Sequence, residues 1–407
     1  MSRVVVIGAG AAGTMAAIFA AGAGAETILL ERTKDGGRKI LISGGGRCNI
    51  LPARLDESRF VTDSSANTLR KIVRSWPLAE QIAFFETEVG IPLVEESESV
   101  KLFPASHKAR DVRDGLLALA RAKGAGIRMD TLVTDVVPIG ATWNVRCAGT
   151  DAIEADAVIV ACGGLSVPMT GSEGAGLRIA EKLGHTMHQT YAALTPIVSS
   201  PAPFASLSGV SLAVTLTATA RERSAAATGG FLFTHVGYSG PAVLDVSHVI
   251  VRSRAERDDP PARLTVRWTA HGDAEWTERL KPHGARSVIG ALRSEMPDRL
   301  AAALLAAANV PADRALSELP REERMRLIEM LVRGALPWTS DEGYKKAEVT
   351  GGGVSLAEID PRTMESRRCP GLYLCGEVLD AFGPIGGYNF LWAWATGRAA
   401  GLGAARA

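Results

Sequence analysis

The distribution of apolar, polar and small residues predicts a strand, a helix and a second strand at the start of the chain. Residues 3–7 and 27–30 are short β-branched runs, and the small residues at 11–23 between them favour a helix. The same order returns at residues 156–160 and 372–375, where a glycine-rich turn follows each apolar run. Strands that alternate with helices in this way predict an α/β fold.

Two stretches between these segments have other patterns. From about residue 192 apolar and polar residues alternate, for example at 212–216 and 264–268, which favours antiparallel sheet or a small barrel. From about residue 285 to 333 apolar residues recur at helical spacing, and we interpret these stripes as core faces rather than as a ligand groove. The last of these stripes consists of Met325, Ile328, Leu331 and Val332.

Composition and charge narrow the class of protein. The chain has 407 residues, enough for two or three folding units, and 46% of them are hydrophobic while 22% are charged. The 45 Lys and Arg residues against 44 Asp and Glu residues give a formal net charge of +1. We therefore expect no nucleic-acid partner and no anionic membrane partner.

The cysteines and the N-terminus bear on the cellular compartment. The five cysteines are scattered without a Cys-x-x-Cys pair, which argues against a disulfide framework or a zinc ribbon and fits a reducing compartment. The seven histidines are equally dispersed, so we predict no metal site. The apolar run after Arg3 resembles a signal peptide, but glycines at spacings typical of a nucleotide site interrupt it. We expect a cytoplasmic protein.

Three glycines form a Gly-x-Gly-x-x-Gly motif between the first strand and the first helix. Gly8 permits the tight turn, Gly10 lets the backbone approach a pyrophosphate, and Gly13 allows close packing of helix on strand. The phosphates are then held at the helix N-terminus, where free N–H groups and the helix dipole favour anions. Glu31 ends the second strand and is placed to accept hydrogen bonds from ribose hydroxyls. The motif predicts a dinucleotide site and, taken alone, fits either FAD or NAD.

Further segments carry a resemblance to a known family: residues 36–49, 161–185, 234–247 and 349–397. The first is GGRKILISGGGRCN, and the last contains CGEVLDAFGPIGGYNFLWAWATG. Together with the N-terminal motif they extend from one end of the chain to the other. In these segments the chain resembles the BaiN-like (YhiN-like) flavoproteins, a family of NAD(P)/FAD-dependent oxidoreductases.

The resemblance implies a fold of the α/β class, a glutathione-reductase-like FAD-binding Rossmann domain with inserted β-barrel-like and small helical domains. This agrees with the two changes of pattern along the chain. We place the FAD-binding domain at residues 1–191 and 348–407, the β-barrel-like insert at 192–284 with completion by about 334–347, and the helical insert at 285–333.

The resemblance also implies how FAD is held. The Gly376-Glu377 turn would lie near the ribityl chain and pyrophosphate, and the helix that starts near Asn389 would point its N–H groups at the pyrimidine end of the flavin. Such N–H groups stabilise the negative charge of a reduced flavin. The motif and the resemblance together predict these FAD-binding residues: Gly8, Gly10, Ala11, Ala12, Gly13, Glu31, Arg32, Gly37, Lys39, Ser43, Gly45, Arg47, Cys48, Asn49, Val133, Ala161, Gly163, Gly376, Glu377, Gly386, Gly387, Tyr388 and Asn389.

Two segments depart from the family pattern. Residues 50–52 are Ile-Leu-Pro where a Thr-Asn-like pair is usual, and residues 390–392 are Phe-Leu-Trp where a Leu-Gln-x pattern is common. Both lie near the expected flavin pocket, so they put the fit of the substrate in doubt rather than FAD itself. We interpret the glycines at 351–353 as a flexible turn.

Five residues are candidates for substrate chemistry, each with a plainer alternative. Cys48 has no second cysteine four residues away, so we expect a lone thiol or a packed pocket wall rather than a dithiol mechanism. Arg47 holds an anionic substrate or the flavin edge, or forms a structural salt bridge. Tyr388 donates a proton to a reduced alkene or carbonyl, or packs on the ring. His235 and Tyr238 in the insert have neighbouring glycines that suggest a binding loop.

These observations favour an enzyme, an FAD-dependent oxidoreductase that acts on a small molecule. No second Gly-x-Gly-x-x-Gly follows a strand, so NAD(P)H is expected only as a transient electron donor. Reduction of an activated C=C bond, as in steroid-like bile-acid intermediates, is what the resemblance implies. The alternatives are an RNA-modifying flavoprotein, against which the balanced charge argues, and a non-catalytic flavin-binding sensor.

Overall fold

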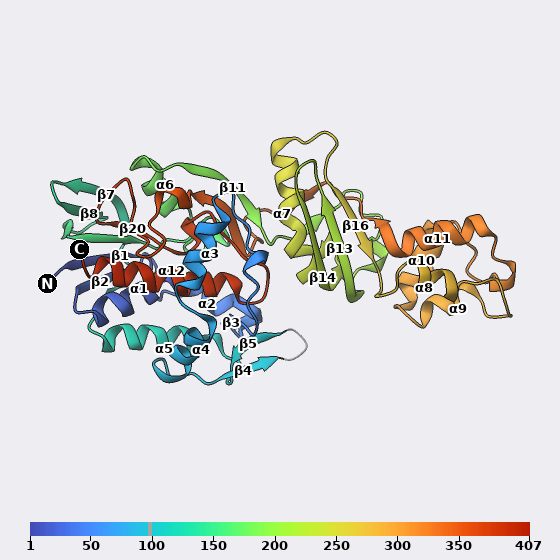
Figure 1. Ribbon diagram of the computed structural model, residues 1–407, viewed down its shortest axis with the longest axis horizontal. Coiled ribbons are helices and arrows are strands. Elements are labelled where there is room, and N and C mark those ends of the chain that lie inside the picture. Colours follow the sequence, from blue (N-terminus) through green and yellow to red (C-terminus); the bar gives the residue numbers. More distant parts are fainter. Residues whose placement is uncertain (97–99) are drawn as a thin grey trace. The chain divides into compact units, whose positions relative to one another are not determined.

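The computed structural model describes residues 1–96 and 100–407. Contacts divide the chain into two compact units (Figure 1). The first unit comprises Met1–Tyr191 and Val349–Ala407, and the second comprises Ala192–Glu348. The first unit is therefore built from both ends of the chain, and the second interrupts it.

A five-stranded parallel sheet forms the centre of the first unit. Val5 on its middle strand pairs with Val158 on one side and with Ile28 on the other. The middle strand is buried almost completely, as expected for a parallel strand that is covered on both faces. The strand order is β20 (Leu372–Leu374), β10 (Ala157–Val160), β1 (Arg3–Ile7), β2 (Glu26–Leu30) and β6 (Gly126–Arg128). The α/β class expected from the sequence is confirmed.

Two helices from opposite ends of the chain pack closely in this unit: α1 (Ala11–Gly22) and α12 (Tyr388–Ala404). Both run beside the parallel sheet (Figure 1). Glycines on α12 make the close approach possible, because a Cβ at Gly397 would lie 2.4 Å from the Ala12 carbonyl oxygen. A Cβ at Gly401 would lie 2.3 Å from the carbonyl oxygen of Ala16. The C-terminal helix is thus fixed against the helix of the N-terminal nucleotide motif.

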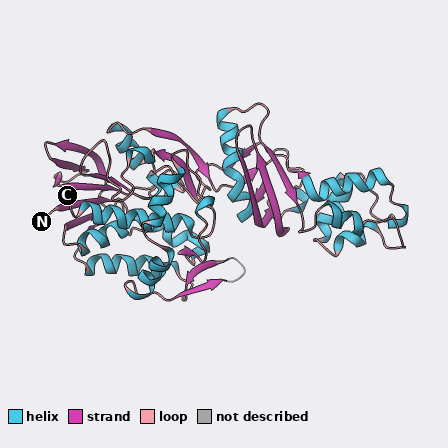
Figure 2. Ribbon diagram, viewed as in Figure 1, coloured by secondary structure: helices cyan, strands magenta, loops and turns pink. Residues whose placement is uncertain are grey.

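Smaller sheets and helices surround this centre (Figure 2). The helices are α2 (Arg38–Ile42), α3 (Ala66–Arg74), α4 (Leu78–Thr87), α5 (Ala109–Ala122) and α6 (Ala175–Lys182). One antiparallel sheet consists of β3 (Leu51–Pro52), β5 (Lys101–Pro104) and β4 (Leu93–Glu96). Another consists of β7 (Val133–Ile139), β8 (Thr142–Cys147) and β9 (Ile153–Ala155). A two-stranded sheet joins β11 (Met187–Ala193) to β19 (Val349–Val354).

The glycines at 351–353 are part of strand β19, so their interpretation as a flexible turn is wrong. Every residue of this strand is buried. A Cβ at Gly351 would lie 2.3 Å from ring atoms of Tyr191, and one at Gly352 would lie 2.2 Å from the carbonyl oxygen of Gln189. The three glycines are present because β19 is packed tightly between other segments, a tertiary contact that a local sequence pattern does not reveal.

The second unit contains a seven-stranded antiparallel sheet. Its strand order is β17 (Gly334–Ala335), β16 (Arg263–Arg267), β13 (Ser211–Thr219), β14 (Ser224–Phe233), β15 (Gly237–Ser239), β12 (Ile197–Val198) and β18 (Ser340–Asp341). Leu216 pairs with Val266, and both side chains are buried while neighbours on the opposite face are partly exposed. Helix α7 (Pro241–Glu256) packs on β13 and β14. The alternation predicted from residue 192 onward corresponds to this sheet.

Four more helices of the second unit are α8 (Asp273–Arg279), α9 (Val288–Arg293), α10 (Asp298–Ala307) and α11 (Arg321–Arg333). The predicted stripe on α9 and α10 is buried, as shown by Leu292 and Leu300 at 0% exposure. Met325 on α11 is 56% exposed, so its assignment to the core face is wrong. At 100° per residue it lies about 110° from the centre of the buried face of α11.

Among the described residues, no helix combines the length and apolarity needed to cross a bilayer.

Candidate cofactor-binding site

Two glycines of the N-terminal motif are required by packing. Gly8 has a φ of 103°, and its N–H group donates to the Leu30 carbonyl oxygen at 2.7 Å. A Cβ at Gly8 would lie 2.7 Å from the carbonyl oxygen of Ala161. A Cβ at Gly13 would lie 1.9 Å from the carbonyl oxygen of Gly8. The turn and the start of α1 are therefore in direct contact, and neither position accepts a side chain.

Gly10 differs from the other two glycines because its surroundings are open. It is the N-cap of α1 with a φ of −82°, a conformation that any residue adopts. No heavy atom of the described chain lies within 4 Å of a Cβ built there. The first N–H groups of a helix have no partner within the helix, so they are free to bind an anion. The space beside Gly10 is thus bordered by donors that suit a pyrophosphate.

Glu31 follows the end of β2 and is 7% exposed. One carboxylate oxygen accepts from the Ala9 N–H group at 2.8 Å. The other accepts from the N–H group of Thr33 at 2.8 Å and from its hydroxyl at 2.7 Å. Because a carboxylate has about four acceptor positions, one remains for a ribose hydroxyl. The neighbouring Arg32 forms an ion pair with Glu173, with 2.6 Å between nitrogen and oxygen.

Helix α2 begins beside the glycine turn. The Gly37 N–H group donates to the Ala9 carbonyl oxygen at 2.8 Å, and a Cβ at Gly37 would lie 2.5 Å from Cγ of Arg113. Lys39, in the first turn of α2, directs its ammonium group to two oxygens. Its Nζ lies 2.7 Å from Oγ of Ser166 and 2.7 Å from Oε2 of Glu377.

The turn that follows β20 packs on the first turn of α1. A Cβ at Gly376 would lie 2.8 Å from Cβ of Ala12. The next residue, Glu377, has a carboxylate that accepts from Lys39 through Oε2 and from Ser166 through Oε1. Oε1 also accepts from the N–H group of Thr350 at 3.0 Å and from its hydroxyl at 2.8 Å. Segments far apart in the sequence therefore meet at one carboxylate.

The segment from Ser43 to Asn49 has an unusual backbone. Gly44, Gly45 and Gly46 all have positive φ values, and a Cβ at Gly45 would meet no described atom within 4 Å. Asn49 is half-buried, and its Oδ1 is buried without a hydrogen-bond partner in the described part of the chain. A buried acceptor without a partner is costly, and a ligand donor that reached Asn49 would remove this cost.

Cys48 and Arg47 are both held by protein groups in this segment. Cys48 is fully buried, and burial raises the pKa of its thiol to about 12. The guanidinium of Arg47 forms an ion pair with Glu96 at 2.8 Å and lies 4.4 Å above the centre of the Phe103 ring. This geometry favours the plainer alternatives, a packed wall for the thiol and a structural ion pair for the guanidinium.

The start of α12 is shaped by glycines with positive φ. Gly387 has a φ of 87°, and a Cβ there would lie 2.3 Å from the carbonyl carbon of Leu51. The hydroxyl of Tyr388 accepts from the Asp56 N–H group at 3.2 Å. Asn389 binds both backbone groups of Gly383, each at 2.9 Å. The side chain of Tyr388 therefore holds the loop after β3 and that of Asn389 the loop before α12, while Gly386 precedes the helix with a φ of 122°.

Three more predicted FAD-binding residues, Ala161, Gly163 and Val133, lie in the first unit. Ala161 follows β10, and its N–H group donates to the Ile7 carbonyl oxygen at 2.9 Å. Gly163 has a φ of 71°, and a Cβ there would lie 2.7 Å from Oγ of Ser172. Val133 is buried at the start of β7.

Sequence reasoning missed Ser166, Thr350 and Thr33, which bind the predicted acids Glu377 and Glu31. Ser166 and Thr350 lie within the segments that resemble the family. The segments were therefore predicted, but these two side chains were not among the predicted site residues. The signal that identifies them is the carboxylate they share, and this becomes visible only when the chain is folded.

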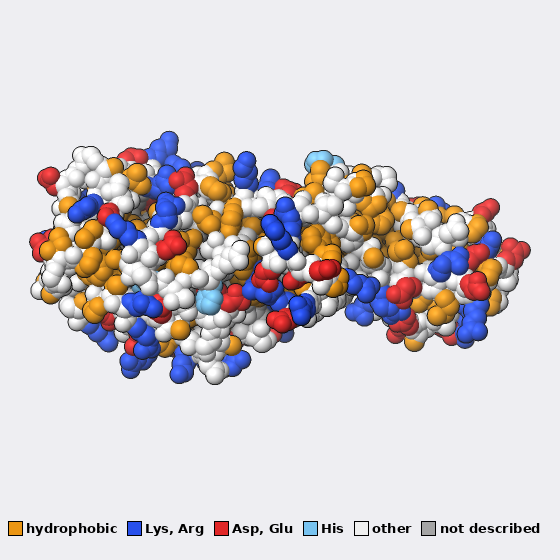
Figure 3. Space-filling model, turned by 90° about the horizontal axis from the view of Figure 1, so that it is seen from above, with side chains coloured by type: hydrophobic (Ala, Val, Ile, Leu, Met, Phe, Trp, Pro, Cys, Tyr) orange, Lys and Arg blue, Asp and Glu red, His pale blue; other side chains and the backbone are white. Residues whose placement is uncertain are grey.

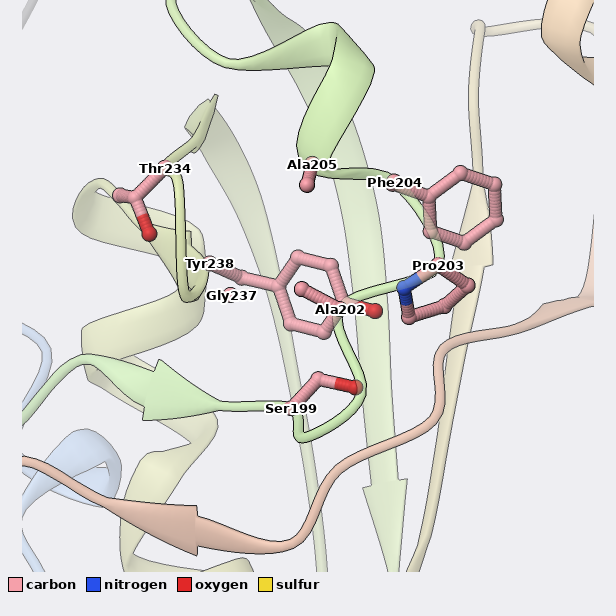
Figure 4. Close-up of a pocket in the computed structure, with 8 residues that line it drawn as sticks. All are labelled: Ser199, Ala202, Pro203, Phe204, Ala205, Thr234, Gly237 and Tyr238. Carbon is pink, nitrogen blue, oxygen red and sulfur yellow. The ribbon is translucent and has the colours of Figure 1, made fainter.

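A small pocket in the second unit lies around Tyr238, on β15 (Figure 4). Its empty volume is about 140 Å³, and its lining residues are Ser199, Ala202, Pro203, Phe204, Ala205, Thr234, Gly237 and Tyr238. The Tyr238 ring is 1% exposed, and burial raises the pKa of its hydroxyl to about 12. The pocket is narrow, with apolar side chains closing around the ring, so in this conformation it is not a site for a substrate ring.

The residues of the first unit fit FAD on three structural observations. The space beside Gly10 is open although Gly8 and Gly13 are tightly packed. Glu31, the residue after β2, has one acceptor position to spare. The orphaned Oδ1 of Asn49 supplies an acceptor, and flavins carry an N–H donor on the pyrimidine ring. The fold and this site define a dinucleotide-binding protein of the Rossmann α/β class.

The chain belongs to the family described as HI0933-like protein Rossmann domain, whose model matches residues 2–403. It is 32% identical over 415 residues to the 3-dehydro-bile acid delta(4,6)-reductase of Clostridium scindens, with 100% of this chain and 99% of that protein covered. It is 30% identical over 404 residues to the ribosomal RNA dihydrouridine synthase of Escherichia coli K12, with 96% and 95% covered. The resemblance to the BaiN-like flavoproteins is confirmed.

The fold is also similar to a solved structure, the Mycobacterium smegmatis Sdh1 complex in the apo form, with a TM-score of 0.52. That match has 15% sequence identity and covers 100% of this chain and 68% of the other. Family and fold together make this chain an FAD-dependent oxidoreductase with a Rossmann-type FAD-binding fold and additional domains.

Proposed function

We propose that this protein uses FAD and NAD(P)H to reduce a C=C bond that is conjugated to a carbonyl group. The observation that carries the proposal is the chemistry shared by two relatives of full length. One is named 3-dehydro-bile acid delta(4,6)-reductase, and the other is named ribosomal RNA dihydrouridine synthase. An enone and a uracil ring both contain a double bond next to a carbonyl, so both accept a hydride at the carbon remote from that carbonyl.

Bound FAD would supply the hydride in such a reaction. The residues that would hold it are the start of α1, Glu31 at the adenosine ribose, the Gly376-Glu377 turn, Asn49 and the start of α12. Backbone N–H groups at the start of α12 would stabilise negative charge at the pyrimidine end of the ring. Gly386 and Gly387, both with positive φ, present no side chain to this approach.

Three of the five candidates for substrate chemistry, Cys48, Arg47 and Tyr388, have supporting roles in this proposal. Cys48 is a packed residue of the segment Ser43 to Asn49, because its thiol is fully buried and burial raises its pKa to about 12. Arg47 holds the glycine segment through Glu96 and Phe103. Tyr388 fixes residues near Asp56 through its hydroxyl. None of these three side chains would then donate the proton that the substrate needs. The proton would come from solvent or from a group that faces the substrate beside the bound flavin.

Anaerobic reduction tests the proposal directly. Protein loaded with FAD is mixed with NADH or NADPH without oxygen, and loss of flavin absorbance is followed by stopped flow. A conjugated enone steroid is then added, with its saturated analogue as the control. We expect bleaching by one nicotinamide and recolouring by the enone alone. If neither nicotinamide bleaches the flavin, the NAD(P)H-linked proposal is wrong.

A second candidate function is modification of ribosomal RNA, and the name of the Escherichia coli relative favours it. Electrostatics do not add support, because basic and acidic side chains are interspersed on the face shown in Figure 3 and the formal charge is +1. Incubation of unmodified ribosomal RNA with the reduced protein, followed by mass spectrometry of nucleosides, separates the two candidates. Formation of dihydrouridine would establish modification of ribosomal RNA. Absence of dihydrouridine together with turnover of the enone would establish reduction of a small molecule.

A further inference from the structure

The ion pair between Lys39 and Glu377 joins two segments that are both anchored at the start of α1. Helix α2 is tied to the glycine turn by the hydrogen bond from Gly37 to Ala9. The turn that carries Glu377 packs through Gly376 on Ala12. The pair is therefore carried by two segments that contact the glycine turn and the first turn of α1, where the pyrophosphate and ribityl chain of the cofactor would be held.

The charges of the pair are only partly screened by solvent. The Lys39 side chain is 29% exposed and the Glu377 side chain 16% exposed, so water screens both only in part. The carboxylate accepts four hydrogen bonds, one of them from Lys39. Lys39 uses two of its three ammonium hydrogens on Ser166 and Glu377, and the third has no partner within residues 1–96 and 100–407.

We propose that the Lys39–Glu377 pair sets the electrostatic potential at the bound flavin and thereby its reduction potential. Reduction adds negative charge to the flavin, so a nearby cation favours the reduced form and a nearby anion opposes it. With both charges present the two effects offset each other. Removal of one partner leaves the charge of the other uncompensated. The two single substitutions therefore shift the reduction potential in opposite directions. This inference rests on the FAD site of the proposed function.

The test compares midpoint potentials of FAD-loaded variants, measured by equilibration with redox dyes during slow anaerobic reduction. Lys39→Met leaves an unpaired carboxylate and lowers the potential, whereas Glu377→Gln leaves an unpaired ammonium and raises it. We expect each to change the ratio of affinities for reduced and oxidised FAD about tenfold, which is about 30 mV for a two-electron couple. The double variant has a potential between the two single variants.

Arg38→Gln is the matched control, because Arg38 lies next to Lys39 on α2 and pairs with Asp35 at a more exposed position. It leaves the potential unchanged. A purely structural pair predicts a different result, in which both single variants lose affinity for oxidised and reduced FAD alike and the potential stays constant.

Glu377→Gln decides the inference even if Lys39→Met does not retain FAD. A potential that does not rise in this variant overturns the inference. The measurement uses neither NAD(P)H nor an alkene, so its failure is separate from failure of the proposed reaction. If the wild-type protein does not bind FAD, it is the proposed function that is refuted.

Discussion

Gly10→Ala isolates the binding of the cofactor from the stability of the fold. A Cβ at this position meets no described atom within 4 Å, and the backbone φ of −82° suits alanine. Loss of glycine at a helix N-cap costs roughly 0.5–1 kcal/mol, and the lower entropy of the unfolded chain returns about 0.4–1 kcal/mol. The free energy of unfolding of the FAD-free protein should therefore change by less than about 1 kcal/mol.

The same methyl group occupies the space in which a pyrophosphate would approach the backbone. Loss of one hydrogen bond between an N–H group and a charged phosphate costs about 1.5–3 kcal/mol. At about 1.4 kcal/mol for each factor of ten, the affinity for FAD falls roughly tenfold to a hundredfold. Titration of FAD into deflavinated protein, followed by quenching of flavin fluorescence, measures this loss, and urea unfolding measures stability.

Gly13→Ala is the contrasting variant at the same motif. Its Cβ would lie 1.9 Å from a backbone oxygen that cannot move without the turn, so we expect destabilisation of about 3 kcal/mol or more. The two substitutions are chemically identical, and only their surroundings differ. If Gly10→Ala binds FAD as tightly as the wild type, the pyrophosphate is not held at this turn and the assignment of the site is refuted.

The remaining predictions concern packing, pH and thiol reactivity. Gly401→Ala should destabilise the protein by about 1–3 kcal/mol because its Cβ would lie 2.3 Å from a backbone oxygen of α1, whereas Gly22→Ala, with only ordinary contacts, should not lower the melting temperature. Burial opposes ionisation of Glu358, but hydrogen bonds from Thr186 and Arg368 outweigh it and lower its pKa to about 2. Its stabilising contribution is therefore complete above the ordinary value of 4.5 and is lost as the pH falls towards 2, so urea unfolding of Glu358→Gln and wild type should differ at pH 7 and converge in acid. Cys48 should resist alkylation by iodoacetamide at pH 8 in the native protein and react after unfolding, as peptide mapping would show; rapid native labelling would contradict its burial.

Local patterns in the sequence predicted the parts of the fold that depend on near neighbours. The β-branched runs at 3–7 and 27–30 correspond to β1 and β2, because alternation and propensity act over a few residues. The turn at Gly8 and the packing of Gly13 on it were predicted from their spacing because both are local, whereas the contact of Gly8 with Ala161 comes from a distant segment. Met325 was misplaced because its stripe advances in steps of three residues, and each such step drifts by about 60° around a helix, so Met325 lies about 120° from Leu331.

Only the tertiary structure decided which distant residues meet. Lys39 and Glu377 are 338 positions apart, and nothing in the pattern around either residue specifies the other. The glycines of β19 looked like a turn because the groups that exclude their side chains come from other segments, from β11 at Gly351 and Gly352 and from Val378 at Gly353. The orphaned oxygen of Asn49 is likewise a property of burial and not of sequence. The sequence determined that a dinucleotide turn forms at the N-terminus, and the folded chain decided which charges surround it, because electrostatic and packing contacts depend on distance in space.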